Sequence, residues 1–246
     1  VYVLIMEHSA FRYKGEAMRG LGSSRKLLTE RHEALVEQER SALKALQSAL
    51  NAFGADVAPG DTRTLDEILA HLGELFMLVI AGEFNSGKSS FTNALLGDKV
   101  VAEGVTPTTD RITLIRHGDH IEEIPKGDYI VERHFPADVL RSMVIVDTPG
   151  TNAVIRRHEE LTSEFIPRAD LVLFVTSADR PFTESERAFL EMIREWGKKV
   201  VIVLNKVDLL SEPERVQIEA FITEHATKLF GFAPEIFAVS ARAAQK

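Results

Sequence analysis

The chain has 246 residues, 45% of them hydrophobic, and it contains no cysteine, which excludes disulfide bonds and thiolate metal sites. Its formal net charge of −8, without a basic run, argues against nucleic acid or an anionic lipid surface as a partner of these residues. No apolar run approaches the ~20 residues of a membrane span, and the composition is compatible with a globular protein of the reducing cytoplasm.

The N-terminal part of the chain is predicted to be helical. Residues 24–53 have the pattern of one long helix, and a second short helix is predicted over 64–72, where a capping-box pattern begins it. The apolar stripe of the long helix consists of Leu28, Leu35, Ala42, Leu43, Leu46, Ala49, Leu50 and Phe53. Such a stripe is typical of a docking surface more often than of an oligomerisation seam, and we expect it to cover part of the following domain. We therefore divide the chain into a helical segment over 1–73, part of a bundle or stalk, and a second domain over 74–246.

The second domain alternates apolar runs with helical segments. Strands are predicted over 75–81, 111–117, 129–133, 143–147, 170–176, 200–205 and 235–239, and helices over 88–96, 153–165, 183–195 and 213–229. This alternation predicts an α/β fold, a doubly wound and mostly parallel sheet with helices on both faces. A sheet of this kind normally ends in a helix, but the chain stops a few residues after its last strand. We therefore expect the sequence to be a fragment of a longer protein, without its C-terminal stalk.

A phosphate-binding loop is the most informative motif. Residues 82–89 read GEFNSGKS, directly after a predicted buried strand and before a predicted helix, which is the context that the P-loop mechanism requires. Glycines let backbone N–H groups curl around phosphate oxygens, and the helix N-terminus adds partial positive charge. Lys88 is predicted to bridge the β- and γ-phosphates, and Ser89 to place its hydroxyl on Mg²⁺. The nucleotide-binding residues predicted here are Gly82, Glu83, Asn85, Ser86, Gly87, Lys88, Ser89 and Ser90.

A second motif, Asp147-Thr148-Pro149-Gly150, follows the strand predicted over 143–147. The carboxylate of Asp147 can hold Mg²⁺ through water, and the N–H of Gly150 can sense the γ-phosphate. Taken alone, a D-x-x-G pattern is weak. Its position at the carboxyl end of a strand, after a P-loop, makes it part of a joint signal.

Two further motifs address the base of the nucleotide. Asp208, in the sequence Asn205-Lys206-Val207-Asp208, can accept hydrogen bonds from both N1 and N2 of guanine, and adenine cannot donate both. A site built around such an acceptor rejects ligands that lack the donors by roughly 10⁴ to 10⁵. Ser240-Ala241 follows the last predicted strand and can offer a backbone N–H to the guanine O6. The four motifs together predict a GTP-binding P-loop domain.

The motifs resemble those of a particular family. Residues 81–90, AGEFNSGKSS, are similar to the phosphate loop of bacterial dynamin-like proteins and their chloroplast relatives of the fuzzy-onions type, and residues 104–110, 146–152 and 177–186 agree with the same family. The resemblance covers roughly residues 75–241. It implies a large GTPase that remodels or fuses membranes, is cytoplasmic and peripheral to the membrane, pairs its GTP domains face to face across the nucleotide, and contacts lipid only through regions absent from this chain.

The resemblance also implies catalytic roles. It favours Thr109 as the residue that holds Mg²⁺ and the attacking water, with Thr108 as the alternative. The glutamine that orients water in other GTPases is absent, because Thr151 and Phe84 stand at the two positions where such a glutamine occurs. Asn85 resembles the asparagine of potassium-activated GTPases, so we expect it to hold K⁺ or Na⁺ against the β–γ bridge. The alternative is that Asn85 only stabilises its own loop.

Residues 179–186 stand where dynamins reach into the partner's nucleotide site, and the alternative is an ordinary solvated loop. The catalytic residues expected from the whole sequence are Lys88, Asn85, Thr109 and Gly150. Two other functions remain open at this point: a regulatory GTP switch of the ribosome-assembly or tRNA-modification kind, and a GTP-binding scaffold that does not hydrolyse.

Overall fold

The computed structural model of the chain describes residues 30–53, 65, 69, 76–103, 111–150 and 164–245. The strands are β1 (Met77–Ala81), β2 (Ile112–His117), β3 (Glu122–Pro125), β4 (Ile130–Phe135), β5 (Val144–Asp147), β6 (Leu171–Ser177), β7 (Val200–Asn205) and β8 (Glu235–Ala238). The described helices are α2 (Glu30–Phe53), α4 (Lys88–Leu96), α6 (Glu184–Glu195), α7 (Glu212–Phe230) and α8 (Ala241–Ala244), with 3₁₀ turns η4 (Asp138–Arg141) and η6 (Val207–Leu209).

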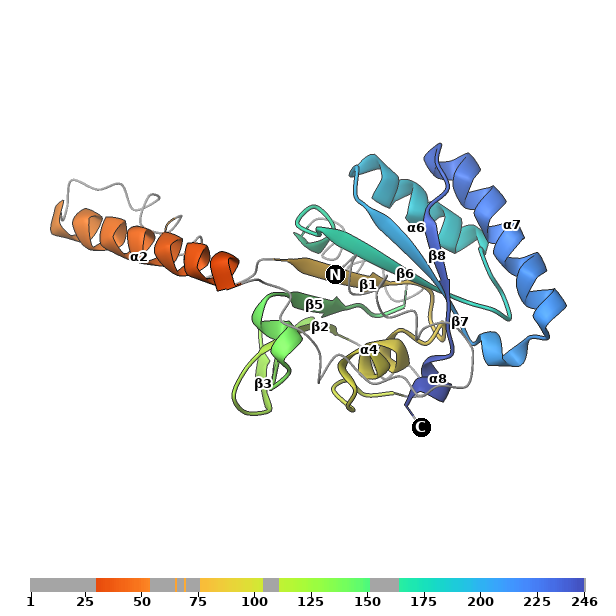
Figure 1. Cartoon of the computed structure of the whole chain (residues 1–246), viewed down its shortest axis with the longest axis horizontal. Helices are drawn as coiled ribbons and strands as arrows, with labels where there is room; N and C mark the ends of the chain where they lie inside the picture. Colours follow the sequence, from red (N-terminus) through yellow and green to blue (C-terminus); the bar gives the residue numbers. More distant parts are fainter. Residues whose placement is uncertain are drawn as a thin grey trace.

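The eight strands form one sheet in the order β3-β4-β2-β5-β1-β6-β7-β8. From β5 to β8 all neighbours are parallel, so the carboxyl ends of these strands lie at one edge of the sheet (Figure 1). β2 runs antiparallel to β5, with Thr113 opposite Asp147, and β3 runs antiparallel to β4. The predicted α/β sheet, mostly parallel, is therefore confirmed.

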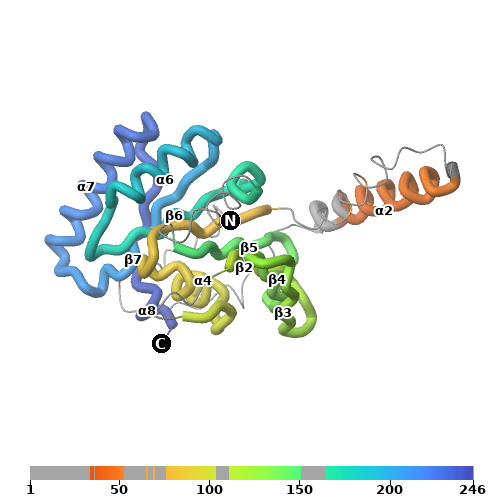
Figure 2. The backbone as a smooth tube through the Cα atoms, turned by 180° about the vertical axis from the view of Figure 1, so that it is seen from behind, coloured from red at the N-terminus to blue at the C-terminus, as the bar shows by residue number. Residues whose placement is uncertain are grey.

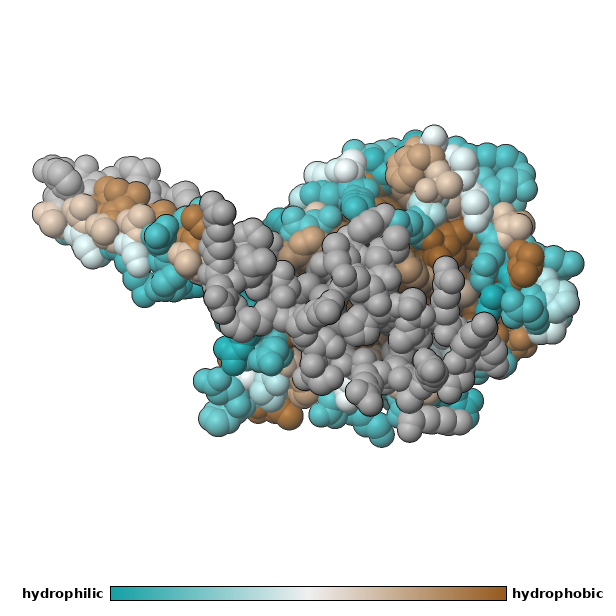
Figure 3. Space-filling view, in the orientation of Figure 1, coloured by the Kyte–Doolittle hydropathy of each residue, from teal (hydrophilic) through white to brown (hydrophobic). Residues whose placement is uncertain are grey.

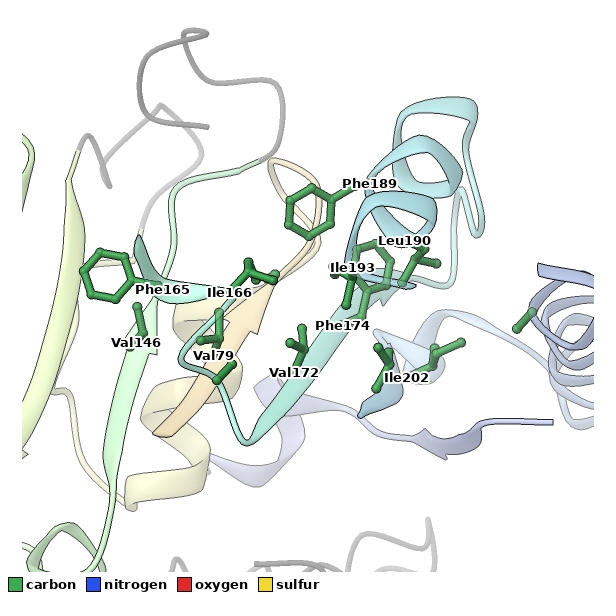
Figure 4. Close-up of a cluster of buried hydrophobic side chains, with 14 of the residues drawn as sticks. Val79, Val146, Phe165, Ile166, Val172, Phe174, Phe189, Leu190, Ile193 and Ile202 are labelled. Carbon is green, nitrogen blue, oxygen red and sulfur yellow. The ribbon is translucent and has the colours of Figure 1, made fainter. Parts of the chain in front are cut away.

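Helices cover both faces of the sheet, as Figures 1 and 2 show from opposite sides. α6 and α7 lie on one face, where Phe174 and Ile202 of the sheet pack in a cluster with Leu190 and Ile193 of α6 (Figure 4). α4 and α8 lie on the other face, over a second buried cluster that includes Ile80 and Ile145. Alternate residues of β5 thus enter opposite cores, Val146 toward α6 and Ile145 toward α4.

Two elements differ from the sequence prediction. β3 was not predicted, because its sequence Glu-Glu-Ile-Pro is exposed and lacks the alternation that marks a half-buried strand. α8 was not predicted either, since four residues are too few for a helical period. Most of two predicted helices lies outside the described residues: all of 153–165 except residues 164 and 165, and all of 64–72 except residues 65 and 69.

α2 extends away from the sheet (Figures 1 and 2), so our expectation that it covers part of the domain was wrong. Two leucines of its predicted stripe, Leu35 and Leu46, are each 49% exposed. Figure 3 shows apolar side chains gathered along this helix. Among the described helices, none is both long enough and apolar enough to cross a membrane.

Candidate functional site

The phosphate loop connects β1 to α4 at the carboxyl edge of the sheet. Gly82 follows β1 directly, and Asn85 lies at the exposed tip of the loop in the left-handed region, with a φ of +62°. Gly87 precedes α4 with a φ of +89°, and a Cβ there would lie 2.3 Å from the Nδ2 atom of Asn205. Only glycine fits this position, because both the backbone conformation and the close approach exclude a side chain.

Lys88 is held inside the loop. Its Nζ donates to the carbonyl oxygen of Glu83 at 2.8 Å, and the side chain is only 6% exposed. Burial lowers the pKa of Lys88 to about 8, while the negative charges of Asp147, Glu186 and Glu83 oppose that shift. The ammonium group is therefore poorly solvated and is curled onto its own loop, so an incoming polyphosphate would be a strong alternative partner.

Asp147 ends β5 beside the start of α4. It is fully buried, and its carboxylate accepts hydrogen bonds from Ser89 Oγ at 3.2 Å and from Thr92 Oγ1 at 3.5 Å. Burial raises the pKa of Asp147 to about 6, against the opposing charge of Lys88 and these two hydrogen bonds. A buried carboxylate and a hydroxyl at this separation form an oxygen donor set of the kind that Mg²⁺ takes alongside water and phosphate. The residues present therefore fit the predicted metal.

The D-x-x-G loop lies directly against the phosphate loop. A Cβ on Gly150 would stand 2.5 Å from both the Cα and the N atoms of Phe84. Thr148 fixes the approach of this loop by donating its hydroxyl to the carbonyl of Ile80 at 2.8 Å. The backbone of Gly150 is therefore in contact with the P-loop at a position that admits no side chain.

Asn205 joins two loops that are far apart in the sequence. Its Nδ2 donates to the carbonyl of Ser86 at 3.0 Å, and its Oδ1 accepts from the N–H of Ala241 at 3.0 Å. The asparagine is 2% exposed. Ser240 caps the following helix by accepting from the N–H of Ala243 at 3.2 Å. The phosphate loop and the Ser240-Ala241 loop are thus held in fixed relation by one buried amide.

Lys206 and Asp208 directly follow β7, at the same carboxyl edge of the sheet. Lys206 adopts a φ of +64° and pairs with Asp179, Nζ to Oδ1 at 3.5 Å. A hydrogen bond from Ser177 and the charge of Lys206 hold the pKa of Asp179 below its ordinary value, against a smaller opposing effect of burial. Asp208 is exposed in η6, and its carboxylate makes no hydrogen bond to another residue in the described part of the chain. Its acceptor atoms are free to meet a ligand.

A buried carboxyl that sequence reasoning did not single out lies next to this site. Glu186 is 1% exposed, and its Oε2 accepts from Thr176 Oγ1 at 2.9 Å and from the N–H of Thr183 at 3.2 Å. Burial raises the pKa of Glu186 to about 7 despite these hydrogen bonds. The signal was present in the sequence, because Thr183 and Glu186 have capping-box spacing before the predicted helix.

Glu83 of the phosphate loop also contacts this region. Its Oε1 accepts from the hydroxyl of Thr183 at 2.5 Å and from the hydroxyl of Ser185. The segment over 179–186 is therefore not an unattached solvated loop. It is fastened to the P-loop through Glu83 and to the Asn205-Lys206 motif through Asp179.

Ser90 and Thr109, both predicted site residues, are not shown by the structure at a ligand position. The hydroxyl of Ser90 donates to Glu103 Oε2 at 2.5 Å, so its side chain already has a partner within the protein. Thr109, with the alternative Thr108, lies outside the described residues, as does Thr151. The structure therefore brings together the phosphate loop, Asp147, Gly150, the Asn205 motif and the Ser240-Ala241 loop, and it does not test the expected threonine.

A P-loop followed by D-x-x-G, N-K-x-D and S-A loops at one sheet edge defines a guanine-nucleotide-binding domain, a GTPase. The family model described as 50S ribosome-binding GTPase matches residues 77–206, which is more than half of the chain. The chain belongs to this GTPase family.

Of two relatives, one agrees with the dynamin-like resemblance and the other is a GTPase of a different kind. The chain is 40% identical over 226 residues to a probable transmembrane GTPase, FZO-like and chloroplastic, of Arabidopsis thaliana, covering 88% of this chain and 24% of that protein. It is 31% identical over 208 residues to the tRNA modification GTPase MnmE of Geobacter sulfurreducens, covering 78% of this chain and 41% of that protein. The chain thus spans less than half of each of these relatives.

A solved structure of an oligomerised bacterial dynamin pair superposes with a TM-score of 0.62 at 19% identity, covering 90% of this chain and 41% of that chain. At this identity the similarity establishes the fold. The predicted family resemblance and the P-loop GTPase fold are both confirmed.

Proposed function

We propose that the described site binds GTP with Mg²⁺ and hydrolyses it through the residues predicted from the motifs. The observation that carries this proposal is the buried Asn205 amide, which joins the phosphate loop at Ser86 to the base loop at Ala241. A nucleotide has phosphates and a base at a fixed separation, so a site that binds it needs a phosphate-binding loop and a base-binding loop held in a fixed relative position. Lys88 would then leave the Glu83 carbonyl for the β- and γ-phosphates.

Ser89 and Asp147 are the described groups that would hold Mg²⁺, directly and through water, and the metal neutralises charge on the β- and γ-phosphates when it is bound. Gly150 would donate its N–H to the γ-phosphate, and its close approach to the phosphate loop supports this role. Thr109 stays the proposed holder of the attacking water. Asp208 supplies the exposed carboxylate that selects guanine.

We further propose that the domain over 74–246 pairs with a second copy across the nucleotide, that Asn85 holds K⁺ or Na⁺, and that the whole protein acts at membranes through regions outside this chain. The FZO-like relative at 40% identity supports a membrane role. The exposed position of Asn85 at the loop tip supports the cation. The attachment of 179–186 to Glu83 and Lys206 supports a route by which a partner could influence the site.

GTP turnover per subunit, measured as the protein concentration rises, tests the proposal. We expect the rate per subunit to increase with concentration, because pairing completes the site, and Lys88→Ala to abolish turnover at every concentration. Lys228→Ala, on an exposed face of α7, serves as the control.

A slow rate that does not depend on protein concentration would instead favour a regulatory switch. The similarity to the tRNA modification GTPase supports this alternative function. Binding of GTP without any turnover, in the presence of Mg²⁺ and K⁺, would favour a non-hydrolysing scaffold. Failure to bind GTP would contradict the proposal as a whole.

A further inference from the structure

Glu103 is the centre of a polar cluster that none of the four motifs uses. Its carboxylate accepts hydrogen bonds from three side chains: Ser90 Oγ at 2.5 Å, Asn93 Nδ2 at 2.6 Å and Gln245 Nε2 at 2.9 Å. Burial alone would raise the pKa of Glu103, but these hydrogen bonds together with Lys99 outweigh it and lower the pKa. The group is therefore a charged acceptor for donors from one helix and from the residue that directly follows another.

One of those helices is α8, which directly follows the base loop. A helix of four residues is far below the ~12 to 15 residues at which an isolated helix becomes stable. Its position must therefore come from contacts with its surroundings. At its first residue, the N–H of Ala241 donates to Asn205, and just after its last residue Gln245 donates to Glu103 and, at 2.7 Å, to the carbonyl of Ser90.

The other helix is α4, which directly follows the phosphate loop. Ser90 lies in its first turn, and Asn93 lies one turn later with only 2% of its surface exposed. Asn93 also binds the backbone of Val100 and Val101, accepting from both N–H groups at 2.8 Å. Glu103 is therefore tied to a rigid part of the phosphate-binding helix.

We propose that Glu103 is a positioning residue for base recognition, because it holds α8, and with it the Ser240-Ala241 loop, against the phosphate-binding helix. This inference rests on the proposed binding of a guanine nucleotide. It assigns Glu103 a role at the base end of the ligand and none at the phosphate end. Loss of the carboxylate should lower the affinity for ligands that have a base. It should leave the affinity for ligands that have only phosphates nearly unchanged.

The test compares GDP with tripolyphosphate, each with Mg²⁺, in calorimetric titrations of the full chain. We expect Glu103→Ala to weaken GDP about tenfold, as for loss of a charge-assisted hydrogen bond, and to change tripolyphosphate affinity less than about twofold. Glu103→Gln should keep GDP affinity within about threefold, since the amide oxygen can still accept from Gln245 and Asn93 while Ser90 accepts from the amide nitrogen.

Asp98→Ala is the matched control, because Asp98 is exposed in the same connection and its carboxylate accepts a hydrogen bond from the adjacent N–H of Lys99 at 2.7 Å. It should leave both affinities unchanged. Gln245→Ala also removes the contact with the Ser90 carbonyl, so it should lower GDP affinity at least as much as Glu103→Ala does. The double variant should bind GDP little more weakly than Gln245→Ala alone, because both changes break the contact between Glu103 and Gln245.

Equal losses for GDP and tripolyphosphate in Glu103→Ala would make Glu103 a general structural support and overturn the inference. Unchanged GDP affinity would overturn it as well. Failure of the unmodified chain to bind GDP would contradict the proposed nucleotide site itself, which is a separate result because it needs no variant.

Discussion

The side-chain amide of Asn205 donates to the carbonyl oxygen of Ser86 at 3.0 Å, across 119 positions of sequence. The Oδ1 atom of the same amide accepts a hydrogen bond from the N–H of Ala241. A single buried side chain therefore bonds to both the phosphate loop and the base loop. The two loops are therefore one unit, and a change at Asn205 should affect both.

Replacing Asn205 with aspartate should separate the two contacts. The carboxylate can still accept from Ala241, but it cannot donate to the carbonyl of Ser86, and it places an unpaired acceptor and a charge in a buried position. We expect the affinity for GDP to fall about 100-fold. Titration with a fluorescent GDP analogue measures this, and an affinity within threefold of the unmodified chain would contradict the assigned role.

Replacing Asp208 with asparagine should change which base is preferred. An amide offers one acceptor and one donor, so it no longer matches the two donors of guanine, whereas xanthine presents an oxygen to that donor. We expect the affinity for GTP to fall at least about 100-fold relative to the affinity for xanthosine triphosphate. Competition binding with both nucleotides decides the matter, and an unchanged preference for GTP would remove Asp208 from base recognition.

Gly150→Ala should uncouple hydrolysis from binding. The added Cβ would stand 2.5 Å from the backbone of Phe84, so the D-x-x-G loop or the phosphate loop must shift. Because a misplacement of about 1 Å at a reacting centre costs on the order of 100-fold in rate, we expect that loss in GTP turnover with a smaller loss in GDP affinity. Lys228→Ala, on an exposed face of α7, is the control. Equal turnover in the two variants would contradict the argument.

A monovalent cation should accelerate turnover through Asn85. Positive charge at the β–γ bridge stabilises the negative charge that accumulates there, so we expect turnover in KCl to exceed that in a choline salt by at least about tenfold. Asn85→Ala should lose the difference. If the rates in the two salts are the same, Asn85 serves only to shape its own loop.

Glu186 should make stability depend on pH. Its pKa rises from 4.5 to about 7 in the folded chain, so the folded state binds more protons between these values. Stability contributed by the protonated group is fully present below pH 4.5 and is lost as the pH rises through about 7. Glu186→Gln keeps an acceptor for Thr176 without the buried charge, and we expect it to be more stable than the unmodified chain at pH 8 by about 2 kcal/mol.

Urea unfolding at pH 5.5 and pH 8 measures this difference. Glu191→Gln is the control on the same helix, since the side chain of Glu191 is 42% exposed and pairs with Arg187. A pH dependence that is the same in Glu186→Gln and in the unmodified chain would show that another group is responsible.

The sequence was sufficient for those parts of the site that local backbone chemistry determines. Gly87 and Asp147 could be assigned because each motif has a fixed position after a strand, and parallel strands bring their carboxyl ends together. The placement of Glu103 could not be predicted, since its three partners come from two helices and no local pattern relates them. The same holds for Glu83, whose contact with Thr183 spans 100 positions.

The long N-terminal helix illustrates a different limit. Its apolar stripe correctly predicted a helix, and α2 begins at Glu30 and ends at Phe53. The stripe does not specify which surface it packs against, and Leu35 and Leu46 remain exposed. Amphipathic periodicity reports that a face needs a partner but carries no information on the identity of that partner.

The antiparallel ladder between β2 and β5 places Thr113 opposite Asp147. Because successive residues of a strand face opposite sides, a slip of β5 by one position would present Val146 or Thr148 to α4 in place of the aspartate. The strand pairing therefore determines which face of the sheet carries the carboxylate of Asp147, and a shift by one position would remove it from the α4 face completely. Loss of this strand pairing should therefore abolish GTP turnover and not merely lower its rate.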